Sequence, residues 1–130
     1  MKKAIKVVLV VAVVIIIAGF AAVSYLEKNL EALSAMEITD VDLTKIKDGT
    51  YTGYYQSMPV DAKVKVTVEN HAIKEIKLLE HGNGQGKAAE VIPQKVVEAQ
   101  SLKVDSISGA TYSSRVILKA IEVALMSGLN

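Results

Sequence analysis

The feature that most constrains this 130-residue chain is an apolar run at its N-terminus. Between Ala4 and Leu26 the only charged residue is Lys6. A helix rises about 1.5 Å per residue, so about 20 apolar residues cross the roughly 30 Å hydrocarbon core of a bilayer. The many β-branched residues do not oppose a helix there, because in lipid the backbone must form its hydrogen bonds within the segment. We therefore predict a transmembrane anchor over residues 1–26, which leaves about 100 residues for one small domain.

The charges that flank this run indicate its orientation. Three lysines lie at its N-terminal side, and the acidic residues begin only at Glu27. Basic residues tend to stay on the cytoplasmic side of a membrane segment, so we predict a cytoplasmic N-terminus and an extracytoplasmic body over residues 27–130. A cleaved signal peptide is the alternative, because Ala22-Val23-Ser24 has the small-x-small form of a cleavage site. The run exceeds the usual signal-peptide core of about 7–15 residues, which favours an uncleaved anchor.

The composition excludes several classes of function. The body from Glu27 onward holds 12 of the 15 Lys+Arg and all 14 Asp+Glu, a net charge of −2, because Lys2, Lys3 and Lys6 precede it. It therefore has no basic field that would attract nucleic acid. The chain has no cysteine, which excludes disulfides, thiolate metal sites and thiol redox chemistry. Its two histidines and scattered carboxylates form no recognisable metal set, so a redox role would need a bound cofactor.

The body divides into a linker and a domain. Residues 27–47 begin with helix-forming residues and then lose any firm period, and we interpret them as a stalk. The domain occupies residues 48–130. Within it, residues 61–69 alternate apolar and polar side chains, as in a half-buried strand. Strand formers also follow the Asp48-Gly49 turn, and a turn at Asn70-His71 leads into a further strand, so we expect an antiparallel hairpin within a small sheet.

Helical periodicity returns in the second half of the domain. Residues 87–100 are helix-like, with Pro93 as a local interruption. A last helix is expected from Ser113 or Ser114 to about Met126, with one apolar stripe at helical spacing. The predicted fold class is therefore α+β: a small antiparallel sheet with packed helices, preceded by an N-terminal transmembrane helix.

The segment from His81 to Gly86 places three glycines between polar residues. Such a segment does not pack into a core, and we predict a loop. It lacks the terminal Gly-Lys-Ser/Thr of a P-loop, and its glycine spacing is not that of the dinucleotide-binding fingerprint. A plain connecting loop is the simplest interpretation.

A turn of small residues precedes the last helix. Ser108, Gly109 and Ala110 leave the backbone open to a bulky group, and Thr111 offers a hydroxyl. The free amides of a helix start and the positive end of its dipole favour a phosphate, so phosphate attachment at this turn is physically sensible. Such a turn is more often only a helix cap, a role that a serine of the first turn could fill. The residues alone leave both interpretations open.

Two parts of the sequence resemble a known family. Residues 105–111, Asp-Ser-Ile-Ser-Gly-Ala-Thr, fit the flavinylation signature Asp-x-x-Ser/Thr-Gly-Ala-Thr/Ser, and residues 48–125 as a whole resemble the FMN-binding domain family. That family occurs in flavin-bearing subunits of sodium-pumping NADH:quinone oxidoreductases and Rnf-type complexes, and in small exported flavoproteins. The segment Asp48–Gly53 is similar to the family's opening strand and Val64–Ile76 to its hairpin. His81 lies where the family often has a histidine after the third strand.

The resemblance implies a covalent cofactor. A dedicated flavin transferase, using FAD, would esterify FMN through its phosphate to Thr111. Gly109 and Ala110 would give the transferase and the phosphate access, with Ser108 completing the turn. Asp105 would be a recognition element, although an Asx turn is an equally ordinary role for that residue.

The resemblance also implies roles for two rings and a function. Tyr112 adjoins the attachment point and is a candidate to stack on the flavin. His81 is a candidate donor to the flavin or a substrate, although a solvated loop histidine is the more common case. We expect an anchored, extracytoplasmic FMN carrier that passes electrons from a membrane donor to an exported acceptor, with no catalytic side chains of its own. The alternatives are a scaffold subunit without flavin and a reductase that binds FMN non-covalently.

Overall fold

The computed structural model describes residues 1–35, 37–58, 60–82 and 84–129. The chain forms two compact units, Met1–Ala32 and Leu33–Asn130. The first unit consists almost entirely of helix α1 (Lys2–Ala35), whose last residues lie past the boundary at Ala32. Its stretch Lys2–Lys28 is long and apolar enough to cross a membrane, and none of its most apolar part is buried. The predicted N-terminal apolar helix is therefore confirmed, and both a single membrane span and a signal sequence fit it.

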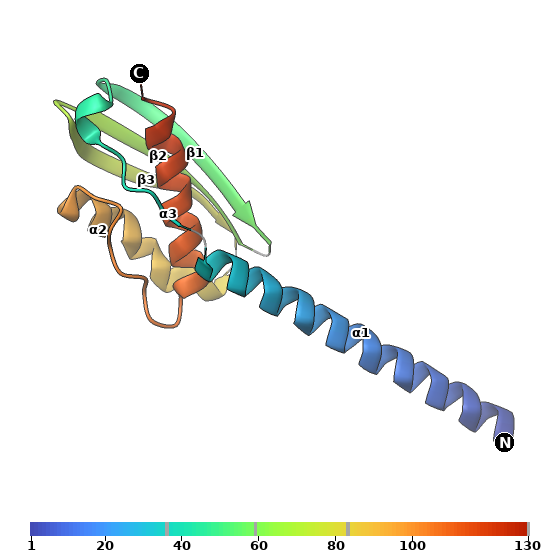
Figure 1. Cartoon of the computed structure of the whole chain (residues 1–130). Helices are drawn as coiled ribbons and strands as arrows, with labels where there is room; N and C mark the ends of the chain where they lie inside the picture. The colour runs from blue at the N-terminus through green and yellow to red at the C-terminus, as the bar shows by residue number, and fades with distance from the viewer. Residues whose placement is uncertain (36, 59, 83, 130) are drawn as a thin grey trace. The chain divides into compact units, whose positions relative to one another are not determined.

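The second unit contains a three-stranded antiparallel sheet in the order β1-β2-β3 (Figure 1). The strands are β1 (Gly49–Ser57), β2 (Val60–Glu69) and β3 (Ala72–Gly82). At the β2–β3 turn Asn70 and His71 have φ values of +52° and +61°, the left-handed values that a two-residue hairpin turn requires. The predicted hairpin and α+β class are confirmed.

Helices α2 (Ile92–Ala99) and α3 (Thr111–Met126) lie on the same face of the sheet (Figure 1). A 3-10 helix, η2 (Gly84–Val91), precedes α2. Two expectations need correction here. The predicted loop at 81–86 begins as strand, because β3 continues through Gly82, and η2 follows. Pro93 does not interrupt a helix, because it lies in the first turn of α2, where a missing N–H costs little.

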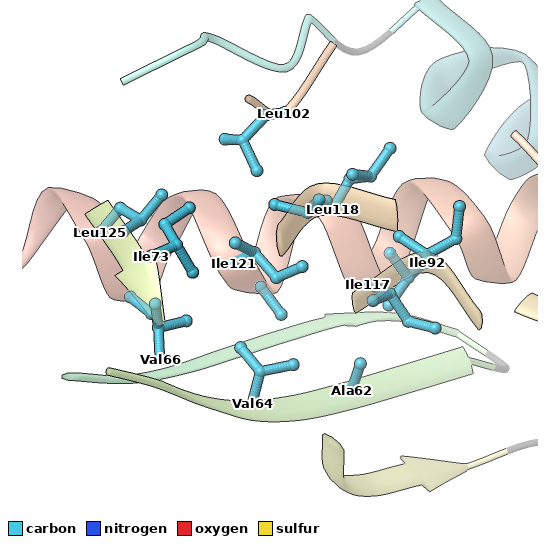
Figure 2. Packing of buried hydrophobic residues seen from close by; sticks show 14 of the residues in the cluster. Ala62, Val64, Val66, Ile73, Ile92, Leu102, Ile117, Leu118, Ile121 and Leu125 are labelled. Carbon is cyan, nitrogen blue, oxygen red and sulfur yellow. The ribbon is translucent and has the colours of Figure 1, made fainter. Parts of the chain in front are cut away.

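The core lies between the sheet and α3. Alternate residues of β2 are fully buried, as the period of two predicts: Ala62, Val64, Val66 and Val68. Ile117 and Ile121 project from α3 toward this row (Figure 2), and both are fully buried. Gly53 lets β1 approach α3 closely, since a Cβ there would lie 2.6 Å from the Ala124 backbone nitrogen.

Residues 38–46, which the sequence assigned to a stalk, pack on the domain. Ile46 is 1% exposed and pairs with Leu129 in an isolated bridge. Asp40 accepts hydrogen bonds from the Ser101 hydroxyl (2.7 Å) and the Leu102 amide (3.1 Å). The folded part therefore begins before Asp48, because isolated apolar residues without a period still bury when a neighbouring surface is apolar. We call residues 38–46 the strap.

Candidate functional site

The turn before α3 is built around a glycine with a positive φ. The Ala110 amide donates to the Ile107 carbonyl over 2.8 Å, and Gly109 has a φ of +80°. This value is that of the third position of a type II turn, which favours glycine. A Cβ built on Gly109 meets no atom within 4 Å, and Ser108 beside it is exposed. The backbone here is open on its outer side, as the small residues predicted.

Thr111 is the first residue of α3, and it is exposed. The helix thus begins two to three residues earlier than the sequence indicated, and the prediction of Ser113 or Ser114 as cap is wrong. The Ser114 hydroxyl is buried, donates to the Ala110 carbonyl (2.7 Å) and accepts from the Ile107 amide (3.0 Å). It therefore braces the turn from within the helix and leaves the helix end uncapped.

The N-terminus of α3 presents backbone amides without a side-chain cap. Ala110 occupies the N-cap position and offers no side-chain acceptor. The first amides of a helix have no intrahelical partner, and they carry the positive end of its dipole. A phosphate ester on the Thr111 oxygen would lie beside these amides, which is a favourable place for an anion.

Tyr112 connects the start of α3 to the turn between β1 and β2. Its hydroxyl lies 2.8 Å from the Met58 carbonyl oxygen, 3.0 Å from the Ser57 carbonyl oxygen and 2.9 Å from the Ser57 hydroxyl. The half-buried ring packs against the core. These contacts give Tyr112 a structural role that the sequence did not indicate, and its stacking on a flavin stays a prediction.

His81 lies in β3, paired with Ala62 of β2, and is not a solvated loop residue. Its side chain is 3% exposed. Its Nδ1 lies 3.4 Å from the Glu90 carboxylate of η2, and its Nε2 is buried with no hydrogen-bond partner in the described part of the chain. The sequence pattern missed this placement because an irregularity in the β2–β3 register between Lys63 and Val64 shifts the alternation near the end of β3.

Asp61 lies at the same end of the sheet as His81, where it pairs with Gly82 of β3. It accepts hydrogen bonds from the Gly82 amide (2.9 Å) and the Tyr54 hydroxyl (3.2 Å). Loss of solvent around the phenol and this bond to a carboxylate raise the pKa of Tyr54 above its usual value. The pair fixes the last residues of β3 against β2, and so fixes the position of His81.

Asp105 is exposed, six residues before Thr111. It lines a shallow depression of about 440 Å³ together with residues of α2 and the following segment: Lys95, Glu98, Ala99, Lys103 and Val104. An exposed carboxylate beside the turn is accessible to a modifying enzyme, and recognition by that enzyme stays a prediction for Asp105.

The candidate site therefore combines three parts at one end of the domain. Tyr112 ties the start of α3 to the β1–β2 turn, and the register places the end of β3 beside the start of β2. Among the described residues no group of three or more histidine and carboxylate side chains could hold a metal. The arrangement offers an accessible hydroxyl, anion-binding amides and one buried, unsatisfied ring nitrogen, which suits an organic phosphate ligand with a planar polar ring.

Comparison with known proteins decides the family. Residues 53–126 match the family described as FMN-binding domain. The chain belongs to the FMN-binding domain family. A relative, an NADH:acrylate oxidoreductase of Vibrio harveyi, is 34% identical over 100 residues, which cover 73% of this chain. The match spans only about a tenth of that relative's length. FMN is accordingly the ligand of this domain, and the uncapped helix start and the buried His81 nitrogen fit its phosphate and its polar ring.

Glu90 is the site residue that the sequence analysis missed. Nothing in its local pattern distinguishes it from any solvated polar position of a helix. Only the fold places its carboxylate beside His81, nine residues earlier in the chain.

Proposed function

We propose that this protein is a membrane-held, extracytoplasmic electron carrier whose FMN is joined through its phosphate to Thr111. The single observation that carries the proposal is the exposed Thr111 hydroxyl at the uncapped start of α3. The open Gly109 turn and the signature from Asp105 to Thr111 support it. Membership of the FMN-binding domain family supports FMN as the cofactor.

The attachment reaction balances with FAD as the donor. Thr111 Oγ1 forms a bond to the FMN phosphorus while the phosphoanhydride bond of FAD breaks, so AMP leaves and the hydroxyl proton is released. No described hydrogen bond joins the Thr111 hydroxyl to a basic side chain. The transferase would therefore activate this hydroxyl. The contribution of this domain is an exposed nucleophile and, after the reaction, backbone amides that bind the phosphodiester.

Once bound, FMN supplies the electron transfer, and the domain orients it and sets its environment. The relative from Vibrio harveyi is named for NADH:acrylate oxidoreduction. That a similar segment lies within an oxidoreductase supports a role in passing electrons. The donor and acceptor of this chain are proposed to be a membrane redox protein and an exported partner.

The N-terminal segment supports the location. An apolar helix over Lys2–Lys28 with lysines at its start is compatible with an anchor whose N-terminus is cytoplasmic. Outside the cell a dissociated flavin would be lost, so a covalent bond would retain it. Anchoring would also raise the effective concentration of the flavin for membrane partners.

The test is to express the full chain together with the flavin transferase and measure its intact mass. The wild type is expected to be yellow, to fluoresce in a denaturing gel and to gain the mass of FMN less one water. Thr111→Ala should lose the flavin completely, because it removes the hydroxyl that would form the ester, whereas the other exposed hydroxyl of this turn, on Ser108, lies before the helix start. Thr111→Ser should retain it, since a hydroxyl remains.

Thr52→Ala is the matched control, because Thr52 is another exposed threonine, on β1. It should carry the flavin as the wild type does. An unmodified wild-type Thr111 peptide in the presence of an active transferase would contradict the covalent link. Colour that is lost on denaturation would instead indicate non-covalent FMN.

A further inference from the structure

The buried Nε2 of His81 is a polar atom without a partner in the described part of the chain. Burying a polar group without a hydrogen bond costs free energy, so buried side-chain nitrogens are nearly always paired. Such an atom at the cofactor end of the domain is expected to be satisfied when the cofactor is bound. His81 belongs to the face of the sheet that the helices cover, because its partner Ala62 is one of the inward row of β2.

Glu90 determines which nitrogen of His81 carries the proton. The Nδ1 atom lies 3.4 Å from the Glu90 carboxylate, which can only accept a hydrogen bond when ionised. The neutral ring therefore keeps its proton on Nδ1 and presents a lone pair at Nε2. Histidines that ligate metals are oriented by a carboxylate in the same way.

The residues beside His81 across the sheet include a small side chain. The register places Tyr55, Ala62 and His81 in one row across the three strands at the end of the sheet. Ala62, the middle member, has the smallest side chain in the inward row of β2. Tyr112 ties the start of α3, and hence Thr111, to the β1–β2 turn at this end.

We propose that His81 Nε2 accepts a hydrogen bond from the isoalloxazine ring of the bound FMN, and that Glu90 is the positioning residue that holds the proton on Nδ1. The oxidised ring carries one N–H, in its pyrimidine part, and this is the donor that a lone pair at Nε2 suits. The inference rests on the proposed function, because it needs FMN at this end of the domain.

The experiment compares flavinylated full-length variants whose intact masses prove equal attachment at Thr111. In His81→Leu the flavin is expected to stay attached while its ring is released, so its fluorescence should rise toward that of free FMN and its visible absorbance and midpoint potential should shift. Glu90→Ala should change the same three quantities in the same direction but less. His81→Gln should restore them largely, because the Gln side-chain carbonyl can accept in place of Nε2.

Two controls separate this role from a merely structural one. His71→Asn changes the other histidine, which lies in the β2–β3 turn, and Glu80→Ala removes an exposed carboxylate next to His81 in sequence. Both should leave the flavin spectrum and potential unchanged. Unchanged fluorescence, absorbance and potential in His81→Leu with the flavin attached would overturn the proposal, and if that variant does not fold, unchanged values in Glu90→Ala would do so.

A parallel titration with free FMN distinguishes this proposal from the covalent link. With transferase-free protein, His81→Leu should weaken FMN binding by about three- to tenfold, the worth of one hydrogen bond. If the wild type gains no mass at Thr111 when the active transferase is present, but His81→Leu still weakens the binding of free FMN, the covalent function is contradicted and the His81 contact is supported. Equal affinities of wild type and His81→Leu would overturn the contact.

Discussion

At the scale of single residues, two glycines of this domain are required for different structural reasons. Gly109 has a φ of +80° and open space around it, whereas Gly53 has an ordinary φ and lies against the backbone of α3. A side chain at Gly109 would be strained by its own backbone. A side chain at Gly53 would collide with Ala120 and Ala124.

These differences predict different outcomes for the same substitution. Gly109→Ala should lower the free energy of unfolding by about 1–2 kcal/mol, the cost of a left-handed conformation with a Cβ. Gly53→Ala should lower it more, because β1 and α3 must separate and overpacking adds to the loss of contacts (about 1–3 kcal/mol or above). Urea unfolding of both variants measures the order, and equal losses would contradict it.

Asp42 gives the strap a pH-dependent contact. Its carboxylate accepts from the Thr44 hydroxyl (2.6 Å) and the Thr44 amide (3.0 Å), and these bonds hold the pKa of Asp42 below its ordinary value of 3.8. Stabilisation by the charged form is therefore present above that ordinary value and is lost as pH falls through the lowered one.

Asp42→Asn tests the sign of this effect. The free energy of unfolding of the wild type should exceed that of the variant near neutral pH, and the excess should shrink at a pH far enough below 3.8 to protonate Asp42, because both side chains are then neutral. Denaturant unfolding at the two pH values provides the measurement. An excess that grows on acidification would contradict the assignment.

At the scale of elements, α3 holds the domain together and presents the site. Its inward residues pack on the buried row of β2 (Figure 2). Its first residue is Thr111. The position of the attachment hydroxyl therefore depends on the packing of the whole helix.

Ile121→Ala should lower the free energy of unfolding by about 2–5 kcal/mol, because it removes a fully buried side chain and leaves a cavity. Val123→Ala is the matched control two residues later, where the side chain is exposed. It should change stability by no more than about 0.5 kcal/mol. A similar loss in both variants would contradict the assignment of the inward face.

At the scale of the whole molecule, one apolar helix precedes one folded domain that begins with the strap. Two hydrogen bonds make the strap part of the fold: the Thr39 amide donates to the Glu122 carboxylate of α3 (3.3 Å), and Asp40 accepts from the amide of Leu102, which follows α2 (3.1 Å). The proposed location then requires the domain to lie outside the cytoplasm.

The absence of native cysteine makes this location testable. Thr52→Cys introduces one thiol at an exposed position of β1. In intact cells a membrane-impermeant maleimide should label this variant. A second variant, Lys3→Cys, places the thiol near the N-terminal end of α1 and should react only after lysis. The reverse pattern would contradict the orientation, and release of the labelled protein into the medium with a shortened mass would show a cleaved signal sequence.

The sequence by itself determined the apolar N-terminal helix, the strand at residues 61–69 and the signature at residues 105–111. Each depends on local periodicity or on a contiguous set of residues, so no distant contact is needed to recognise it. The inward row of β2 and the inward face of α3 follow from the same periods.

Only the tertiary structure decided the roles of residues that depend on distant neighbours. His81 is a buried strand residue because a register irregularity shifts the alternation near the end of β3, and Glu90 is its partner because the fold places one carboxylate of η2 beside that side chain. The strap is part of the domain because Ile46 is buried in the hydrophobic core. Burial and hydrogen-bond pairing depend on segments that the fold brings together in space. A local sequence pattern therefore does not predict them.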